Sequence, residues 1–127
     1  MSTPTANKQL VIDFCDALFV PGGAEAAVGK YLSPNYIQHN PYAADGPDAL
    51  AAFVNSALAR NPQTRYELQR SAAEGDLVFV HWRMTTGPAD RGTAVTEIFR
   101  IDGDRIVEHW DVMQAMPEQT VSEHPLF

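Results

Sequence analysis

The segment that most constrains this chain runs from residue 97 to residue 114, where two strand-like stretches flank the sequence Asp102-Gly103-Asp104. Alternating apolar residues around a short Gly-containing turn predict a β-hairpin. Successive strand residues face opposite sides of a sheet, so the length of the turn decides which side chains share a face. The ionisable residues affected are Glu97, Glu108, His109 and Asp111.

Two registers are compatible with this hairpin. A two-residue turn at Asp102-Gly103 places Glu97 opposite Glu108, and like charges directly opposite each other destabilise a strand pair. A three-residue loop that ends with Asp104 in the left-handed conformation places Glu97 opposite His109. We favour this second register because it replaces repulsion with attraction. The residues that then share one face are Glu97, Phe99, Val107, His109, Asp111 and Met113.

A sheltered face of this composition would be suited to acid–base chemistry. Asp111 is the candidate general base, because apolar neighbours and the second carboxylate of Glu97 disfavour its charged form. A protonated His109 opposes that effect, and such mutual tuning can bring a base close to working pH. The alternative is that Glu97, His109 and Asp111 are solvated charges on an outer sheet face.

Other side chains are candidates for a pocket, each with a structural alternative. His39 lies in Gln38-His39-Asn40-Pro41 and either caps a turn or reaches a pocket mouth as a proton shuttle. His81 belongs to a strand, and the sequence does not fix its face. Aromatic residues either fill the core or select an apolar substrate. The candidate substrate contacts are Phe14, Tyr36, Phe53, His81 and Phe99.

The metal-ligand pattern is weak. His109 and Asp111 are two residues apart on one strand, as in some facial metal sites, but no second spaced pair accompanies them. The sequence contains no Gly-rich phosphate loop, no Gly-x-Ser-x-Gly elbow and no pair of cysteines. We therefore expect no metal and no cofactor. The single cysteine, Cys15, has apolar neighbours and is expected to be a buried thiol.

Composition narrows the choice of partner. The net charge of −7 argues against nucleic acid and against anionic membranes. Hydrophobic residues make up 45% of the 127 residues, which fits one globular domain over residues 1–127. The first eight residues are polar, and no apolar run reaches the length of a membrane span. We expect a cytoplasmic protein whose partner is a small molecule or a second copy of the chain.

The order of predicted elements indicates an α+β fold. Apolar residues at spacings of three and four predict helices over residues 5–20, 24–31 and from about 45 to 60. Residues 36–39 read as a brief extended or irregular segment. The second half predicts strands over residues 66–73, 77–85, 93–101 and 105–114, followed by an irregular tail. Helices followed by a curved antiparallel meander leave a concave face that is open to a ligand.

Three stretches together resemble the SnoaL-like polyketide cyclase family of the nuclear transport factor 2-like superfamily. They are residues 36–41, residues 75–82 and, most of all, residues 98–114 with the sequence Glu-His-Trp-Asp-Val. The resemblance covers residues 8 to 118. It implies a cone-shaped α+β barrel, a homodimer and aldol cyclisation without cofactor or metal. It also implies that Asp111 is the acid–base residue, assisted by Glu97, where Asp or His is commoner in relatives.

These observations lead us to expect a cofactor-independent proton-transfer enzyme that acts on a small apolar carbonyl compound. Asp111 would remove a proton next to the carbonyl, and His39 or His109 would stabilise the enolate oxygen or relay the proton. Glu97 would orient His109. The step is a cyclisation, an isomerisation or a dehydration, and epoxide hydrolysis also suits two carboxylates. The alternative is a non-catalytic ligand-binding or dimerisation module of the same fold.

Overall fold

The computed structural model describes residues 2–127 and has the predicted α+β architecture. The described residues form three helices and five strands. Their bounds are α1 Pro4–Leu18, α2 Ala24–Tyr31, β1 Leu32–Gln38, α3 Pro47–Arg60, β2 Arg65–Glu74, β3 Leu77–Thr85, β4 Thr93–Asp102 and β5 Arg105–Ala115. No helix within residues 2–127 is long and apolar enough to cross a membrane.

Helix α1 begins with a capping side chain, whereas α2 and α3 begin after glycines. Thr3 precedes α1, and its hydroxyl accepts a hydrogen bond from the backbone N–H of Ala6 at 3.1 Å. Proline stands in the first turn of both α1 and α3, where its missing N–H costs no helical bond. Asn61 ends α3 directly before Pro62, because the residue before a proline avoids the helical region.

The five strands form one curved, unclosed sheet in the order β1-β5-β4-β3-β2. Strands β2 to β5 make the predicted antiparallel meander, whereas β1 lies parallel to β5. The sequence predicted only a brief extended or irregular segment over residues 36–39, so the seven-residue strand β1, which begins at Leu32, corrects its start and length. Pro34 is compatible with β1 because an edge strand leaves one side free of ladder hydrogen bonds.

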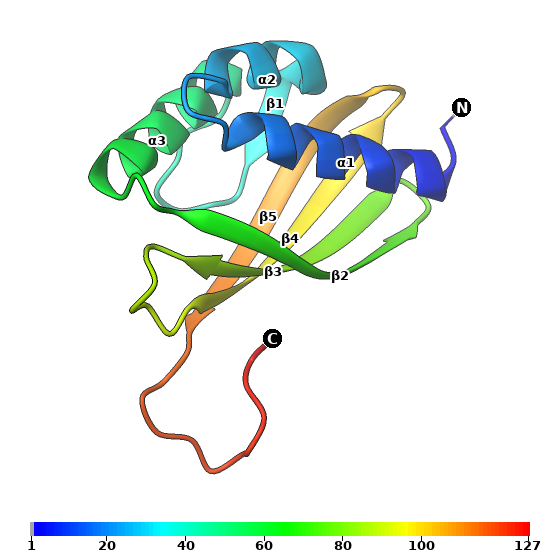
Figure 1. Ribbon diagram of the computed structural model, residues 1–127. Helices are drawn as coiled ribbons and strands as arrows, with labels where there is room; N and C mark the ends of the chain where they lie inside the picture. Colours follow the sequence, from blue (N-terminus) through cyan, green and yellow to red (C-terminus); the bar gives the residue numbers. More distant parts are fainter. Residues whose placement is uncertain (1) are drawn as a thin grey trace.

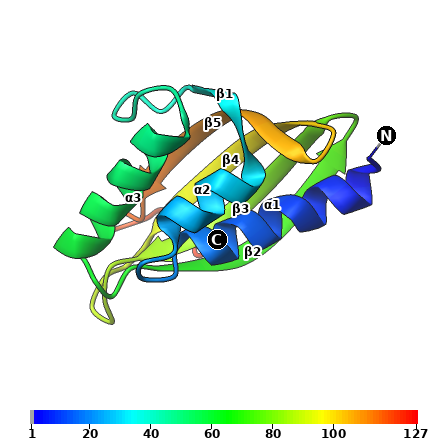
Figure 2. The same cartoon turned by 90° about the horizontal axis from the view of Figure 1, so that it is seen from above.

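The three helices cover one face of the sheet, as Figures 1 and 2 show from two directions. The core lies between these layers. On β3, Val78, Val80 and Trp82 are buried and face the helices, while the residues between them face outward. The segment after β5 is irregular, as predicted, and ends at Phe127, whose ring lies 5.2 Å from the guanidinium of Arg83.

The β4–β5 hairpin has neither of the two predicted registers. Its turn is Gly103-Asp104, and Gly103 has a φ of 63°, as at the first position of a type II′ turn. Ile101 is opposite Ile106 but Arg100 is opposite Glu108, so a bulge leaves Val107 unpaired. Beyond the bulge Glu97 lies opposite Asp111 rather than opposite His109. Relative to the favoured register, the shifted turn and the bulge each move the pairing by one residue. The total shift of two residues preserves strand alternation, so Glu97, His109 and Asp111 still share a face.

Candidate active site

An apolar cavity of about 230 Å³ lies between the concave face of the sheet and helices α1 and α3. Four of the aromatic residues singled out in the sequence line it: Phe14, Tyr36, Phe53 and Phe99. Burial raises the pKa of the Tyr36 hydroxyl, and the nearby Glu97 carboxylate raises it further, so this phenol is uncharged. Cys15 also lines the cavity and is buried, as predicted, and burial raises its thiol pKa.

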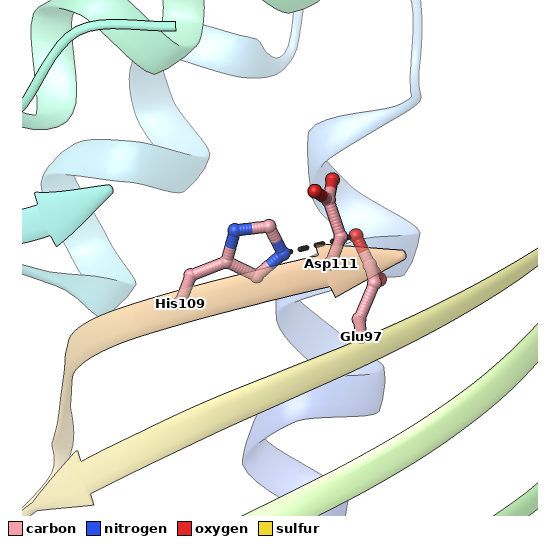
Figure 3. Close-up of side chains that lie close together, drawn as sticks. All are labelled: Glu97, His109 and Asp111. Carbon is pink, nitrogen blue, oxygen red and sulfur yellow. Dashed lines mark hydrogen bonds and ion pairs between the residues drawn. The ribbon is translucent and has the colours of Figure 1, made fainter. Parts of the chain in front are cut away.

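Glu97, His109 and Asp111 form a cluster on the wall of this cavity (Figure 3). Their side chains come from neighbouring positions of β4 and β5, and one nitrogen or oxygen of each lies within 4.8 Å of those of the others. His109 is 5% exposed, and the Glu97 side chain is 13% exposed. The sheltered face expected from the sequence is therefore present, and its charges do not point to bulk water.

Hydrogen-bond donors offset the repulsion between the two opposing carboxylates. Trp82 Nε1–H donates to Oε2 of Glu97 at 2.8 Å, and Nδ2 of Asn40 donates to Oδ2 of Asp111 at 2.9 Å. The other oxygen of Glu97, Oε1, lies 3.3 Å from Nε2 of His109. Charge-assisted bonds of this kind are stronger than neutral ones, which explains how the hairpin tolerates Glu97 opposite Asp111.

Two side chains that contact the cluster, Gln38 and Asn40, were not identified from the sequence. Gln38 pairs with His109 in the parallel β1–β5 ladder, and its Oε1 lies 2.7 Å from Nδ1 of His109. Asn40 lies directly beyond β1, and its Oδ1 accepts the backbone N–H of Tyr42 at 2.8 Å, which aims Nδ2 at Asp111. Strand alternation starting from the buried Tyr36 would have placed both amides on the inner side.

His39 and His81 are not at the cavity among the described residues. His39 lies between Gln38 and Asn40 on the opposite side of the chain, is 42% exposed and stacks on Trp110 at 4.8 Å. His81 alternates with the buried Val80 and Trp82, so it faces outward, where Nδ1 meets Arg70. The structure therefore does not place His39 at a pocket mouth or His81 against a substrate, and we leave both out of the proposed site.

His39 instead belongs to an outer ion-pair network that makes stability depend on pH. Its Nε2 lies 2.8 Å from Glu108, whose other oxygen lies 2.8 Å from Arg100. The hydrogen bond from His39, followed by that from Arg100, lowers the pKa of Glu108. A carboxylate whose pKa is lower in the folded state stabilises the fold above its unfolded pKa, and this contribution is lost as the pH falls through the folded value.

We therefore expect Glu108→Gln to reduce the free energy of unfolding by about 0.2–1 kcal/mol at neutral pH, the range for partly exposed ion pairs. The deficit relative to the unmodified chain should shrink once the pH falls below about 4.3, the ordinary pKa of a glutamate. Urea unfolding at several pH values measures this. Glu74→Gln, at an exposed position, is the matched control. A deficit that does not change with pH would contradict the assignment.

The cluster also has the donor set of a facial metal site. His109 offers a ring nitrogen, and Glu97 and Asp111 each offer a carboxylate oxygen, which together suit several divalent transition metals. Because Nδ1 of His109 already lies 2.7 Å from Oε1 of Gln38, Nε2 is the nitrogen left for a metal, and Nε2 is the atom that lies 3.3 Å from Oε1 of Glu97. A metal and a shared proton would therefore compete for one position.

The fold and this cluster together define a member of a known family. Residues 11–109 match the model of the SnoaL-like domain, so the chain belongs to the SnoaL-like domain family. The match includes Glu97 and His109 and ends two residues before Asp111. None of the curated proteins matches the chain.

Several solved structures share the fold at low sequence identity. A SnoaL-like protein of unknown function from Burkholderia thailandensis is 18% identical with a TM-score of 0.72, covering 91% of this chain and 100% of that one. A candidate isomerase of the SnoaL-like family from Agrobacterium tumefaciens is 16% identical with a TM-score of 0.74, covering 86% and 98%. A candidate polyketide cyclase from Acidithiobacillus ferrooxidans is 20% identical with a TM-score of 0.71, covering 89% and 91%.

Proposed function

We propose that this protein is a cofactor-independent enzyme that transfers protons on a small apolar carbonyl compound, with Asp111 as the general base. The observation that carries this proposal is the placement of Glu97, His109 and Asp111 together on the wall of an apolar cavity. Ionisable groups that are desolvated beside one another in a cavity are typical of acid–base sites. The names of the neighbouring structures, a candidate isomerase and a candidate cyclase, are consistent with such chemistry.

The cavity favours a substrate with one polar end and a compact apolar body. Its volume of about 230 Å³ is just below the range of about 300–1,000 Å³ for drug-sized ligands, which suits a molecule of one or two rings. Phe14, Phe53 and Phe99 supply aromatic walls, and the cluster supplies polar groups on one side. A ketone whose carbonyl lies beside the cluster would bring its neighbouring C–H bond close to Asp111.

The proposed step is enolisation. Asp111 accepts the proton next to the carbonyl, the electrons of the C–H bond move into the enolate, and a hydrogen bond from the Glu97–His109 pair stabilises the enolate oxygen. Return of the proton to another carbon gives isomerisation. Attack of the enolate carbon on a second carbonyl forms a C–C bond and an alkoxide, which takes the proton from Asp111 to complete an aldol cyclisation. Both outcomes regenerate the starting protonation state, so neither needs an oxidant or a reductant.

Enolisation can be tested before the natural substrate is known. We expect the protein to accelerate the exchange of the α-protons of 2-indanone, a bicyclic ketone, for deuterium in D₂O, measured by proton NMR against buffer alone. Exchange should persist after treatment with EDTA. Loss of exchange on chelation would favour a metal enzyme, and binding of 2-indanone without exchange would favour the non-catalytic alternative.

The homodimer and the cytoplasmic location stay predictions. The outer face of the sheet carries Phe79 and Val112, which are 38% and 71% exposed, and such residues support pairing through that face. Sedimentation equilibrium at micromolar concentration distinguishes one chain from two, and the mass of a single chain would contradict a dimer.

A further inference from the structure

One side chain outside the cluster, Gln38, constrains the tautomer of His109. The amide of Gln38 has a fixed orientation, because the backbone N–H of Asn40 donates to its Oε1 at 3.0 Å and its Nε2 donates to the hydroxyl of Tyr36 at 2.9 Å. A backbone N–H can only donate, so the atom that faces it must be the amide oxygen. The oxygen that lies against His109 is therefore an acceptor.

This oxygen determines which ring nitrogen of His109 carries hydrogen. Nδ1 lies 2.7 Å from Oε1 of Gln38, and an amide oxygen can only accept, so Nδ1 is protonated. If the ring is neutral, Nε2 then carries no hydrogen and presents a lone pair. That lone pair lies 3.3 Å from Oε1 of Glu97, and two acceptors at this distance repel each other unless a proton lies between them.

The surroundings favour retention of that proton. Oε2 of Glu97 already accepts the N–H of Trp82, so the shared proton lies on the Oε1 side. Without it, the partly exposed carboxylates of Glu97 and Asp111 would lie opposite each other with no positive group between them. The other titratable groups that line the cavity are Tyr36, Tyr66 and Cys15, and burial raises the pKa of each, so none supplies a charge.

We propose that Gln38 is a positioning residue that fixes the tautomer of His109, so that the Glu97–His109 pair holds one proton between Oε1 and Nε2. The consequence for catalysis rests on the proposed function: this pair is the acid that binds the enolate oxygen, and Asp111 is the base. If the proton moves fully to the oxygen, the product is an enol, the pair has lost one proton and Asp111 has gained one. The reverse transfers restore both.

Nitrogen-15 NMR of the histidine rings near neutral pH tests the tautomer without any substrate. We expect the His109 signals to show a protonated Nδ1 in the unmodified protein. A neutral ring protonated at Nε2 alone would overturn the proposal, because Nε2–H would then donate to an ionised Glu97 and Nδ1 would accept from Gln38.

Two substitutions test whether Gln38 is the cause. Gln38→Glu keeps an acceptor oxygen of the same reach and should keep Nδ1 protonated. Gln38→Met removes the acceptor, so the neutral ring should move its proton to Nε2, where Glu97 accepts it. Gln114→Met, at an exposed position of β5, controls for the loss of an amide. An unchanged tautomer in Gln38→Met would overturn the role of Gln38.

The exchange assay separates this inference from the proposed function. We expect Gln38→Met to slow 2-indanone exchange by at least about tenfold and Gln38→Glu to retain most of the rate, because a wrong histidine tautomer costs orders of magnitude in Ser-His-Asp hydrolases. If the unmodified protein shows the expected His109 tautomer but no exchange, the proposed function is refuted and the inference about the shared proton stands. Full exchange in Gln38→Met despite the altered tautomer would refute the catalytic consequence.

Discussion

Replacement of Asp111 by asparagine is expected to slow the α-proton exchange of 2-indanone by about 10²- to 10⁴-fold, the usual contribution of a positioned general base. Asparagine has nearly the same shape but cannot accept a proton at working pH. Its side-chain oxygen can still accept the hydrogen bond that Nδ2 of Asn40 donates to the carboxylate at 2.9 Å. The variant therefore removes the chemistry and keeps the local contact.

The same substitution should leave the melting temperature unchanged or slightly raised. Glu97 lies opposite Asp111, so neutralising one of the two carboxylates relieves a like-charge pair. Asp104→Asn, at a side chain that is 93% exposed in the hairpin turn, is the matched control and should retain full exchange. Retention of exchange in Asp111→Asn, with the fold intact by circular dichroism, would remove Asp111 from the mechanism.

Truncation of Phe14 to alanine is expected to produce the largest loss of stability, about 3–5 kcal/mol in the free energy of unfolding. Phe14 is 1% exposed, and its ring lies edge-on to Tyr31 at 5.8 Å and to Phe99 at 6.3 Å between centroids. Its removal exposes no new polar group but enlarges the cavity beside α1. Urea unfolding followed by tryptophan fluorescence gives the difference in free energy.

Phe79→Ala is the comparison for this measurement. Phe79 lies on the outer side of β3 and is 38% exposed, so its truncation should cost about 1 kcal/mol or less. Similar losses for Phe14 and Phe79 would mean that the cavity wall around Phe14 is not packed as the structure describes. A small loss for both would point to the same conclusion.

The helices and the meander follow from local patterns, which is why the sequence predicts them well. The prolines at the starts of α1 and α3 and the Gly-Asp turns fix boundaries within a few residues, and the strand over residues 77–85 has the predicted bounds. Strand β1 is different, because its pairing with β5 joins segments about 70 residues apart along the chain. No local pattern reports a parallel pairing of that kind.

The cluster was predicted for an incomplete reason. Attraction between Glu97 and His109 as opposite partners predicts the shared face, whereas in the structure Glu97 lies opposite Asp111. Pairs of residues within the hairpin leave out the donors that reach it from elsewhere, Trp82 and Asn40. These donors make the observed register tolerable, and they come from segments that only the folded chain brings together.

The histidines illustrate the same limit. His39 attracted attention as a titratable residue, but strand alternation turns it outward and turns the uncharged Gln38 and Asn40 inward. Which side chains of Gln38-His39-Asn40 reach the cavity depends on the side to which the buried Tyr36 points. Strand alternation counted from Tyr36 through residue 40 names both amides.

The bulge at Val107 and the tight turn before it have a consequence for how such a protein can diverge. The groups proposed to react come from the β4–β5 hairpin, which also supplies Phe99 to the cavity wall, whereas Phe14 and Phe53 of that wall come from helices α1 and α3. Part of the wall that contacts a guest molecule is thus encoded apart from the groups proposed to react with it. Under the proposed function, substitutions on the helices would retune what enters while the hairpin, inherited intact, would keep the same elementary reaction.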